Sequence, residues 1–158
     1  MPKVRTSASS GFTLVELLVV IVIISVLATL LMANFVGVRQ RGRDAQRKSN
    51  ILAIQQALEL YRSDNGTYPS SSFTLTCGGQ IKSPDGSTTY MTKIPCDPLG
   101  ANQAYNNGNY YYGSTDNGVT YSIGACIENT NDTDSNDVTT FAGANASCTT
   151  KYYVLQNP

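Results

Sequence analysis

The residues that could do chemistry are few in this chain, and Glu16 stands out because it lies near the start of an apolar run. A charge inside such a run is costly unless it is paired. A cut after Gly11 would leave a positive amine on Phe12, one helical turn before Glu16. The carboxylate could pair with that amine in its own chain or in a neighbour, where the pair would fix axial register. Alternatively, Glu16 extends to lipid headgroups.

Composition argues against catalysis and against general nucleic-acid binding. The 158 residues include no histidine, which is the commonest general base and zinc ligand. We find no GxSxG motif, P-loop or dinucleotide fingerprint. The 11 basic and 11 acidic side chains balance, so the chain has no overall charge that would attract polyanions. We therefore expect a structural or binding protein and not an enzyme.

Four cysteines lie in the polar last two thirds of the chain, at Cys77, Cys96, Cys126 and Cys148. They form no CxxC pair, so a zinc or thioredoxin-type site is not expected. An even number in an export-competent chain favours two disulfides, although buried reduced thiols are the alternative. Three pairings are possible, and we favour Cys77–Cys96 with Cys126–Cys148 because each closes a local loop.

The N-terminal third contains the element that must position Glu16. Residues 1–11 are polar and include Lys3 and Arg5, whereas residues 12–36 are almost entirely apolar. A helix of that length spans roughly 37 Å, which is enough to cross a lipid bilayer. Unlike a secretory signal, this run has its small-residue junction before it and not after it. We therefore expect a single-pass helix that remains on the processed chain.

The helix is expected to continue beyond the apolar run. Ile51, Ile54, Leu58 and Tyr61 recur at spacings of three and four, which indicates one buried helical face. The polar and glycine residues at 63–66 mark its end. Between the two parts stands a basic cluster, Arg39, Arg41, Arg43, Arg47 and Lys48. It could contact headgroups, pair with acidic groups of neighbouring subunits or form a solvated face, and it opposes the positive-inside tendency.

Three segments of this sequence resemble a known family. Residues 11–16, GFTLVE, are similar to the signature of class III signal peptides, shared by type IV pilins and type II secretion pseudopilins. Residues 64–69 and 94–100 resemble the NGxYP turn and the IPxDPWG segment of pseudopilins, with leucine in place of the aromatic residue. The resemblance implies cleavage between Gly11 and Phe12, N-methylation of Phe12 and a register role for Glu16.

The resemblance also implies partners and a location. A prepilin peptidase would remove the leader, and a platform membrane protein with an assembly ATPase would stack subunits into a helical homo-oligomer. The precursor would lie in the cytoplasmic membrane and the assembled filament outside the cytoplasm. A minor tip subunit that binds DNA, surfaces or cargo is the alternative function, as is an anchored protein that never polymerises. The kind of filament, whether pilus, secretion pseudopilus or competence fibre, stays open.

An acidic segment near the C-terminus offers oxygen ligands. Asp132, Asp134 and Asn136 have the spacing that opens an EF-hand loop, but Asp137 takes the place of the required glycine. Gly143 stands where the bidentate glutamate should be, so this is not an EF-hand. Major pseudopilins bind calcium near this end of the chain, which implies possible Ca²⁺ ligation by the four residues 132, 134, 136 and 137 in another geometry. The alternative is a mobile solvated loop.

The sequence thus predicts an α+β protein with a pilin-like fold. Residues 70–108 are expected to be irregular, and strands are expected at 109–113, 119–127 and 151–155. Val119, Tyr121, Ile123, Ala125 and Ile127 alternate with small polar residues and would face the helix. The expected segments are a leader at 1–11, a membrane or filament-core helix at 12–36, its amphipathic continuation at 37–64 and a loop-rich, disulfide-linked head at 65–158.

Overall fold

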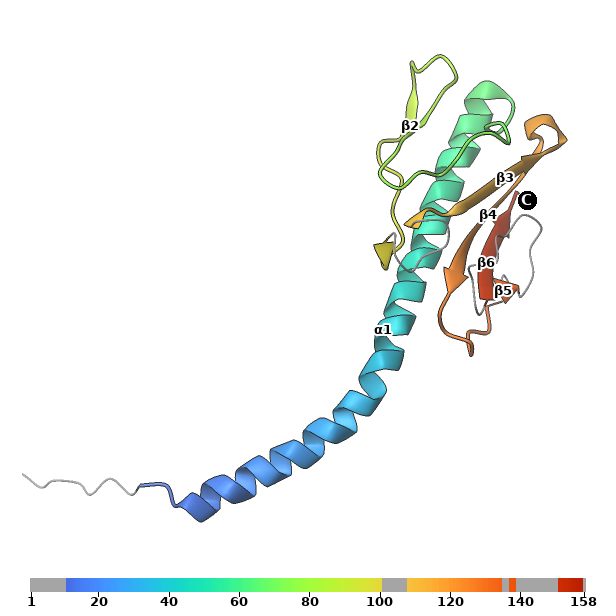
Figure 1. The fold of residues 1–158 in the computed structure, drawn as a ribbon. Coiled ribbons are helices and arrows are strands. Elements are labelled where there is room, and N and C mark those ends of the chain that lie inside the picture. The colour runs from blue at the N-terminus through green and yellow to red at the C-terminus, as the bar shows by residue number, and fades with distance from the viewer. Residues whose placement is uncertain (1–10, 101–107, 135–136, 139–150, 158) are drawn as a thin grey trace, which may run out of the picture. The chain divides into compact units, whose positions relative to one another are not determined.

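The computed structural model describes residues 11–100, 108–134, 137–138 and 151–157. The chain divides into two compact units, residues 1–38 and 39–158, and each is described by itself. One helix, α1 (Leu14–Asn65), runs through 52 residues and belongs to both units (Figure 1). It ends at Gly66, whose φ of 80° is a left-handed conformation that glycine adopts without strain. The Gly66 N–H closes the last turn by donating to the Arg62 carbonyl at 2.8 Å.

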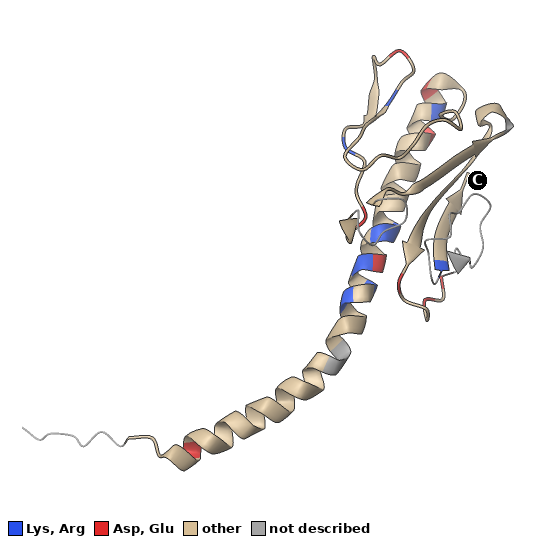
Figure 2. Cartoon of the chain, in the orientation of Figure 1, with Lys and Arg blue, Asp and Glu red and all other residues tan. Residues whose placement is uncertain are grey.

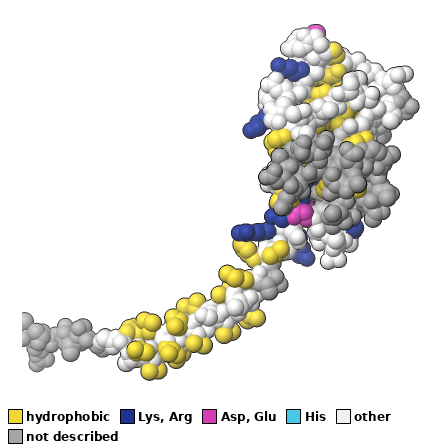
Figure 3. Space-filling view, in the orientation of Figure 1, with side chains coloured by type: hydrophobic (Ala, Val, Ile, Leu, Met, Phe, Trp, Pro, Cys, Tyr) yellow, Lys and Arg dark blue, Asp and Glu magenta, His cyan; other side chains and the backbone are white. Residues whose placement is uncertain are grey.

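In the first unit, the large side chains of the apolar part of α1 are exposed. Its large apolar side chains from Leu14 to Val38 are all exposed, from 48% at Val20 to 81% at Leu14 (Figure 3). By length and composition, α1 is the one helix among the described residues that could cross a membrane. Because a core helix of a globular protein would be mostly buried, this exposure fits an element that packs on something outside its own chain.

The second unit contains a four-stranded antiparallel sheet. Its strands are β3 (Tyr111–Thr115), β4 (Thr120–Ile127), β5 (Asp137–Val138) and β6 (Lys151–Gln156), in the spatial order β3-β4-β6-β5. A 3₁₀ turn, η3 (Asp116–Gly118), joins β3 to β4. Strand β4 is central, and its Ile123 lies opposite Tyr112 on β3 and Leu155 on β6. A separate hairpin pairs β1 (Ile81–Lys82) with β2 (Thr89–Met91).

The core of the head forms between the second half of α1 and this sheet. The predicted helical face is confirmed, because Ile51, Ile54 and Leu58 are fully buried and Tyr61 is nearly so. They pack in one cluster with Tyr121, Ile123, Ala125 and Ile127 of β4 and with tyrosines 68, 110, 112 and 153. The predicted α+β fold is therefore confirmed, and its thin core is filled largely by aromatic rings.

The structure differs from the predicted strands in three places. Residues 70–108 contain the β1–β2 hairpin, where irregular structure was expected. Strand β3 begins two residues later than predicted, and β4 begins at Thr120, so that Val119 lies before the strand and is 53% exposed. Strand β5 was not predicted; it pairs two residues of the acidic segment with Tyr152 and Tyr153 of β6. Such short strands are set by their partners and not by local periodicity.

Candidate functional site

The first candidate site is the start of α1, where Glu16 closes the helix N-terminus. The Thr13 N–H and hydroxyl donate to Glu16 Oε2 at 2.9 and 2.7 Å, and the Glu16 N–H donates back to Thr13 Oγ1 at 3.3 Å. This reciprocal pattern is a capping box, which satisfies amides that have no partner within the helix. Sequence reasoning did not identify it, although the spacing Thr13-x-x-Glu16 is its signal. Gly11 and Phe12 precede the helix and are exposed, and the processing roles assigned to them stay predictions.

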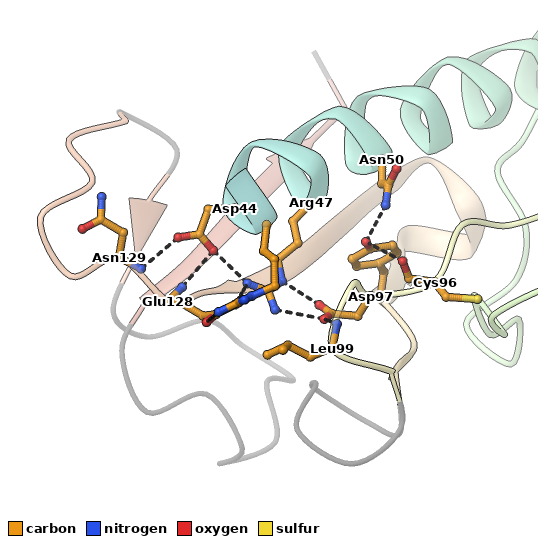
Figure 4. Close-up of polar contacts among 10 residues, drawn as sticks. Asp44, Arg47, Asn50, Cys96, Asp97, Leu99, Glu128 and Asn129 are labelled. Carbon is orange, nitrogen blue, oxygen red and sulfur yellow. Dashed lines mark hydrogen bonds and ion pairs between the residues drawn. The ribbon is translucent and has the colours of Figure 1, made fainter. Parts of the chain in front are cut away.

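The second candidate site is a buried group of charges in the head, which we call the Arg47 cluster: Asp44, Arg47, Asp97 and Glu128 (Figure 4). The Arg47 side chain is only 1% exposed. Its Nε and Nη2 donate to the two carboxylate oxygens of Asp97 at 2.7 and 2.9 Å, while its Nη1 donates to Asp44 at 2.8 Å and Glu128 at 2.6 Å. One guanidinium therefore joins α1, the loop before β3 and the end of β4.

Two acidic members of the Arg47 cluster also accept hydrogen bonds from backbone N–H groups. Asp44 accepts the N–H groups of Glu128 and Asn129 at 3.0 and 2.8 Å, and Asp97 accepts the N–H of Leu99 at 2.9 Å. Asp97 belongs to the segment that resembles IPxDPWG. The structure thus shows what that aspartate does here: it fixes its own turn and binds the helix through Arg47. The turn contact is local and typical of aspartate, whereas the contact with Arg47, 50 residues away, could not be found from local sequence.

Arg43 extends the Arg47 cluster toward solvent. Its Nε donates to Glu128 Oε1 at 2.8 Å, and its Nη2 pairs with Glu128 Oε2 at 2.5 Å. The hydrogen bond from Arg43 lowers the pKa of Glu128, burial opposes this, and the bond from Arg47 adds to it. Burial alone would lower the pKa of Arg47, but its bonds to Asp97 and Glu128 raise it above its ordinary value. Arg43, Arg47 and Glu128 are therefore charged at neutral pH.

Lys48 holds the acidic loop that follows Glu128. Its Nζ lies 3.0 Å from Asp132 Oδ1 and 3.1 Å from Asp134 Oδ2, and 5.1 Å from the centre of the Tyr153 ring. Of the four predicted calcium ligands, Asp132 and Asp134 thus converge on an ammonium group. Asn136 and the Asp137 side chain lie outside the described residues. The described part of the chain has no group of three or more His, Cys, Asp or Glu side chains suited to a metal, and calcium ligation stays a prediction.

Most residues of the basic cluster that follows the apolar run form ion pairs within the head. Figure 2 marks several Lys and Arg positions along the middle of α1. Arg43, Arg47 and Lys48 pair with carboxylates of their own chain, whereas Arg39 and Arg41 are exposed. Intramolecular pairing was not among the alternatives expected from sequence. Asp44 lies three residues from Arg47, but the other acidic partners lie 50 to 86 residues away. The folded head therefore neutralises most of the charge that opposed the positive-inside tendency.

One of the two predicted disulfides lies within the described residues, and the other does not. Cys77 and Cys96 form a disulfide over a separation of 19 residues, as predicted. The Cys126–Cys148 pair stays a prediction because Cys148 lies outside the described residues.

Next to Cys96, the Tyr110 hydroxyl donates to the Cys96 carbonyl at 3.3 Å and accepts from Asn50 of α1 at 2.8 Å (Figure 4). Burial raises the pKa of Tyr110 to about 12, so this hydroxyl keeps its proton.

Comparison with known proteins places the chain in a family. Residues 6–32 match the prokaryotic N-terminal methylation motif, and residues 34–140 match the family described as type II secretion system (T2SS), protein G. The chain belongs to the type II secretion system protein G family. The predicted resemblance is confirmed, and with it the expectation of a structural, non-enzymatic pseudopilin-type subunit. Together with the exposed apolar helix, the methylation motif implies a membrane-inserted precursor that is processed and assembled.

Individual relatives of this chain carry the name of the same family. The type II secretion system core protein G of Dickeya chrysanthemi is 36% identical over 102 residues, which cover 58% of this chain and 63% of the relative. That of Escherichia coli (strain K12) is 34% identical, covering 60% and 70%, and that of Vibrio cholerae serotype O1 is 30% identical, covering 66% and 74%. No solved structure matches. The alignment with the Dickeya protein thus spans less than two thirds of its length.

Proposed function

We propose that this chain is a major subunit of a type II secretion pseudopilus and that it assembles through the apolar part of α1. The observation that carries the proposal is the exposure of every large apolar side chain between Leu14 and Val38. Lipid would cover these side chains in the precursor, and the same helices of neighbouring subunits would cover them in the filament. Burial of a Leu, Ile or Val side chain away from water contributes about 1.5–3 kcal/mol, so these side chains must stay covered in both states. Because lipid tails are as apolar as leucine, close packing between the helices is what favours the filament over the membrane.

Glu16 gives this packing a defined register. In the precursor its carboxylate already accepts two hydrogen bonds from Thr13, and it stands within the first turn of α1. Removal of residues 1–11 would place a new amine on Phe12, one turn away. In an apolar bundle an unpaired carboxylate is unfavourable, so the helices would slide until each Glu16 meets an amine. The match to the N-terminal methylation motif supports this processing step.

The partners of the proposed subunit follow from its chemistry and its family. Processing requires a prepilin peptidase at the membrane, and extraction of an apolar helix from lipid requires a platform protein with an energy source, the assembly ATPase. Family membership supports a periplasmic pseudopilus as the product. The Cys77–Cys96 disulfide supports a head that folds in an oxidising compartment.

The function of Glu16 can be tested apart from its helix cap. Glutamine also fits the third position of a capping box, so Glu16→Gln keeps the cap and removes only the charge. Thr13→Ala is the matched control, because it removes the cap partner and keeps the charge. We expect cells producing Glu16→Gln to insert and process the subunit but to form no filaments in electron micrographs. Thr13→Ala should still form filaments.

Three other outcomes would contradict the proposal. Filaments from Glu16→Gln would show that the carboxylate only caps the helix. A processed wild-type chain that never forms filaments would favour an anchored protein. Wild-type subunits found only at one end of filaments made of another pilin, by gold labelling, would favour the minor tip subunit.

A further inference from the structure

One loop of the head is held at both ends by one face of α1. We call the segment from Glu128 to Asp134 the β4 loop. At its start, the Asp44 carboxylate accepts the N–H groups of Glu128 and Asn129. At its end, the Lys48 ammonium pairs with Asp132 and Asp134 at 3.0 and 3.1 Å. Positions 44 and 48 are one helical turn apart, so the helix presents an anion and a cation side by side.

The two aspartates would repel each other without this cation. Asp132 also accepts the Asp134 N–H at 3.1 Å, which keeps the two residues in one tight turn. Their side chains are only 22% and 31% exposed, so water screens their charges incompletely. A positive charge between them is therefore required for the turn to be stable at neutral pH, whether that charge comes from a metal ion or from a side chain.

The described contacts do not fit calcium at this place. Calcium takes six to eight oxygen ligands at about 2.3–2.6 Å, and an ammonium group offers only donors. The Lys48 Nζ occupies the point on which Asp132 Oδ1 and Asp134 Oδ2 converge, so a metal ion would first have to displace it. A second cation, Lys151, uses its Nζ to bind the Asp132 carbonyl at 2.8 Å, which withdraws another oxygen from any metal.

We propose that Lys48 supplies the positive charge that closes the β4 loop, so that this loop from Glu128 to Asp134 is closed without a divalent cation. The lysine side chain acts as a counter-ion that is covalently part of the chain. It does not depend on the concentration of free ions, and chelators cannot remove it. Its ammonium nitrogen lies over the Tyr153 ring, 5.1 Å from the ring centre, and this contact helps to hold it in place. The inference concerns the head alone and holds whether or not subunits assemble.

The experiment compares melting of the full-length protein in detergent with EGTA and with about 5 mM calcium, a concentration above the dissociation constants of extracellular calcium modules. We expect the same melting temperature in both. Lys48→Met keeps the apolar stem and removes the charge, and it should lower the melting temperature by about 2–4 °C in EGTA. Amide exchange should rise in the β4 loop. Lys93→Met, at an exposed lysine elsewhere in the head, should melt like wild type.

A rise in the wild-type melting temperature with calcium would overturn the proposal, since the loop would then be a metal site. Equal melting of Lys48→Met and Lys93→Met would overturn it as well. If Lys48→Met fails to accumulate, the triple variant Lys48→Met/Asp132→Asn/Asp134→Asn decides, because it removes the repulsion together with the cation. A folded triple variant supports the proposal. A triple variant that also fails to fold contradicts it, because Lys48 would then act through packing on Tyr153 and not through charge.

Discussion

The two halves of α1 are built from similar apolar residues but lie in opposite environments. In the first half Leu18 is 50% exposed and Ile23 is 54% exposed, whereas in the second half Ile54 and Leu58 are completely buried. The first half is apolar on all sides, and the second has an apolar stripe with polar residues between. The difference teaches that one continuous helix can serve two interfaces. Its second half completes the core of its own chain, and its first half is available to pack on lipid or on the same helix of other subunits.

The largest effect on the second half should come from Arg47. Arg47→Met leaves the buried carboxylates of Asp44 and Asp97, and the partly exposed one of Glu128, without their common partner. Loss of one member of a buried ion pair costs about 3–5 kcal/mol. We expect the full-length protein in detergent to lose that much stability to urea. Exposed Arg41 is the matched control, and Arg41→Met should leave the head stable. Equal stability of the two variants would contradict the assigned role of the cluster.

Truncation of one apolar residue in each half separates the two interfaces directly. Ile54→Ala removes a fully buried side chain from the head core and should reduce its stability by about 2–5 kcal/mol. Leu18→Ala should leave head stability unchanged, because Leu18 is exposed and belongs to the first unit, but it should reduce the yield of filaments. Urea unfolding and filament yield from sheared cells measure the two effects. A destabilised head in Leu18→Ala would mean that the halves are not independent.

The smallest effect is a dependence of head stability on acid. Arg43 and Arg47 lower the pKa of Glu128 below its usual 4.5 in the folded head. A lowered carboxyl pKa contributes stability that is fully present above the unfolded value and is lost as the pH falls through the folded value. The melting temperature, followed by tyrosine circular dichroism, should therefore change little between pH 7 and 5 as far as Glu128 is concerned. It should fall below pH 4.5. Arg43→Met should make the fall shallower, and an unchanged fall would contradict the pairing.

Most of the fold could be predicted because it follows from periodicity. The spacing of Ile51, Ile54 and Leu58 predicted the buried face, and the alternation from Tyr121 to Ile127 predicted the central strand. The β1–β2 hairpin was missed because its strands have only two and three residues. Its turn could have been found, since Pro84-Asp85-Gly86 is a turn sequence and Gly86 has a φ of 74°.

The charged contacts of the head could not be predicted from the sequence. Arg47 and Asp97 are 50 residues apart and carry no local pattern that links them. Lys48 and Asp134 are 86 residues apart, and the acidic segment by itself suggested a metal and not a lysine. Glu59 accepts hydrogen bonds from the hydroxyl groups of Tyr68 and Tyr121 at 2.8 and 2.9 Å. In each case the partner is set by how the sheet lies on the helix.

The most direct test of the account is the intact mass of subunits taken from sheared filaments. We predict a chain that begins at Phe12, carries one added methyl group on its terminal amine and lacks residues 1–11. That product alone places a positive amine one turn from Glu16 and leaves the whole apolar half of α1 available for packing. Filaments made of subunits that still begin at Met1 would contradict the account, because Glu16 would then have no new amine to meet.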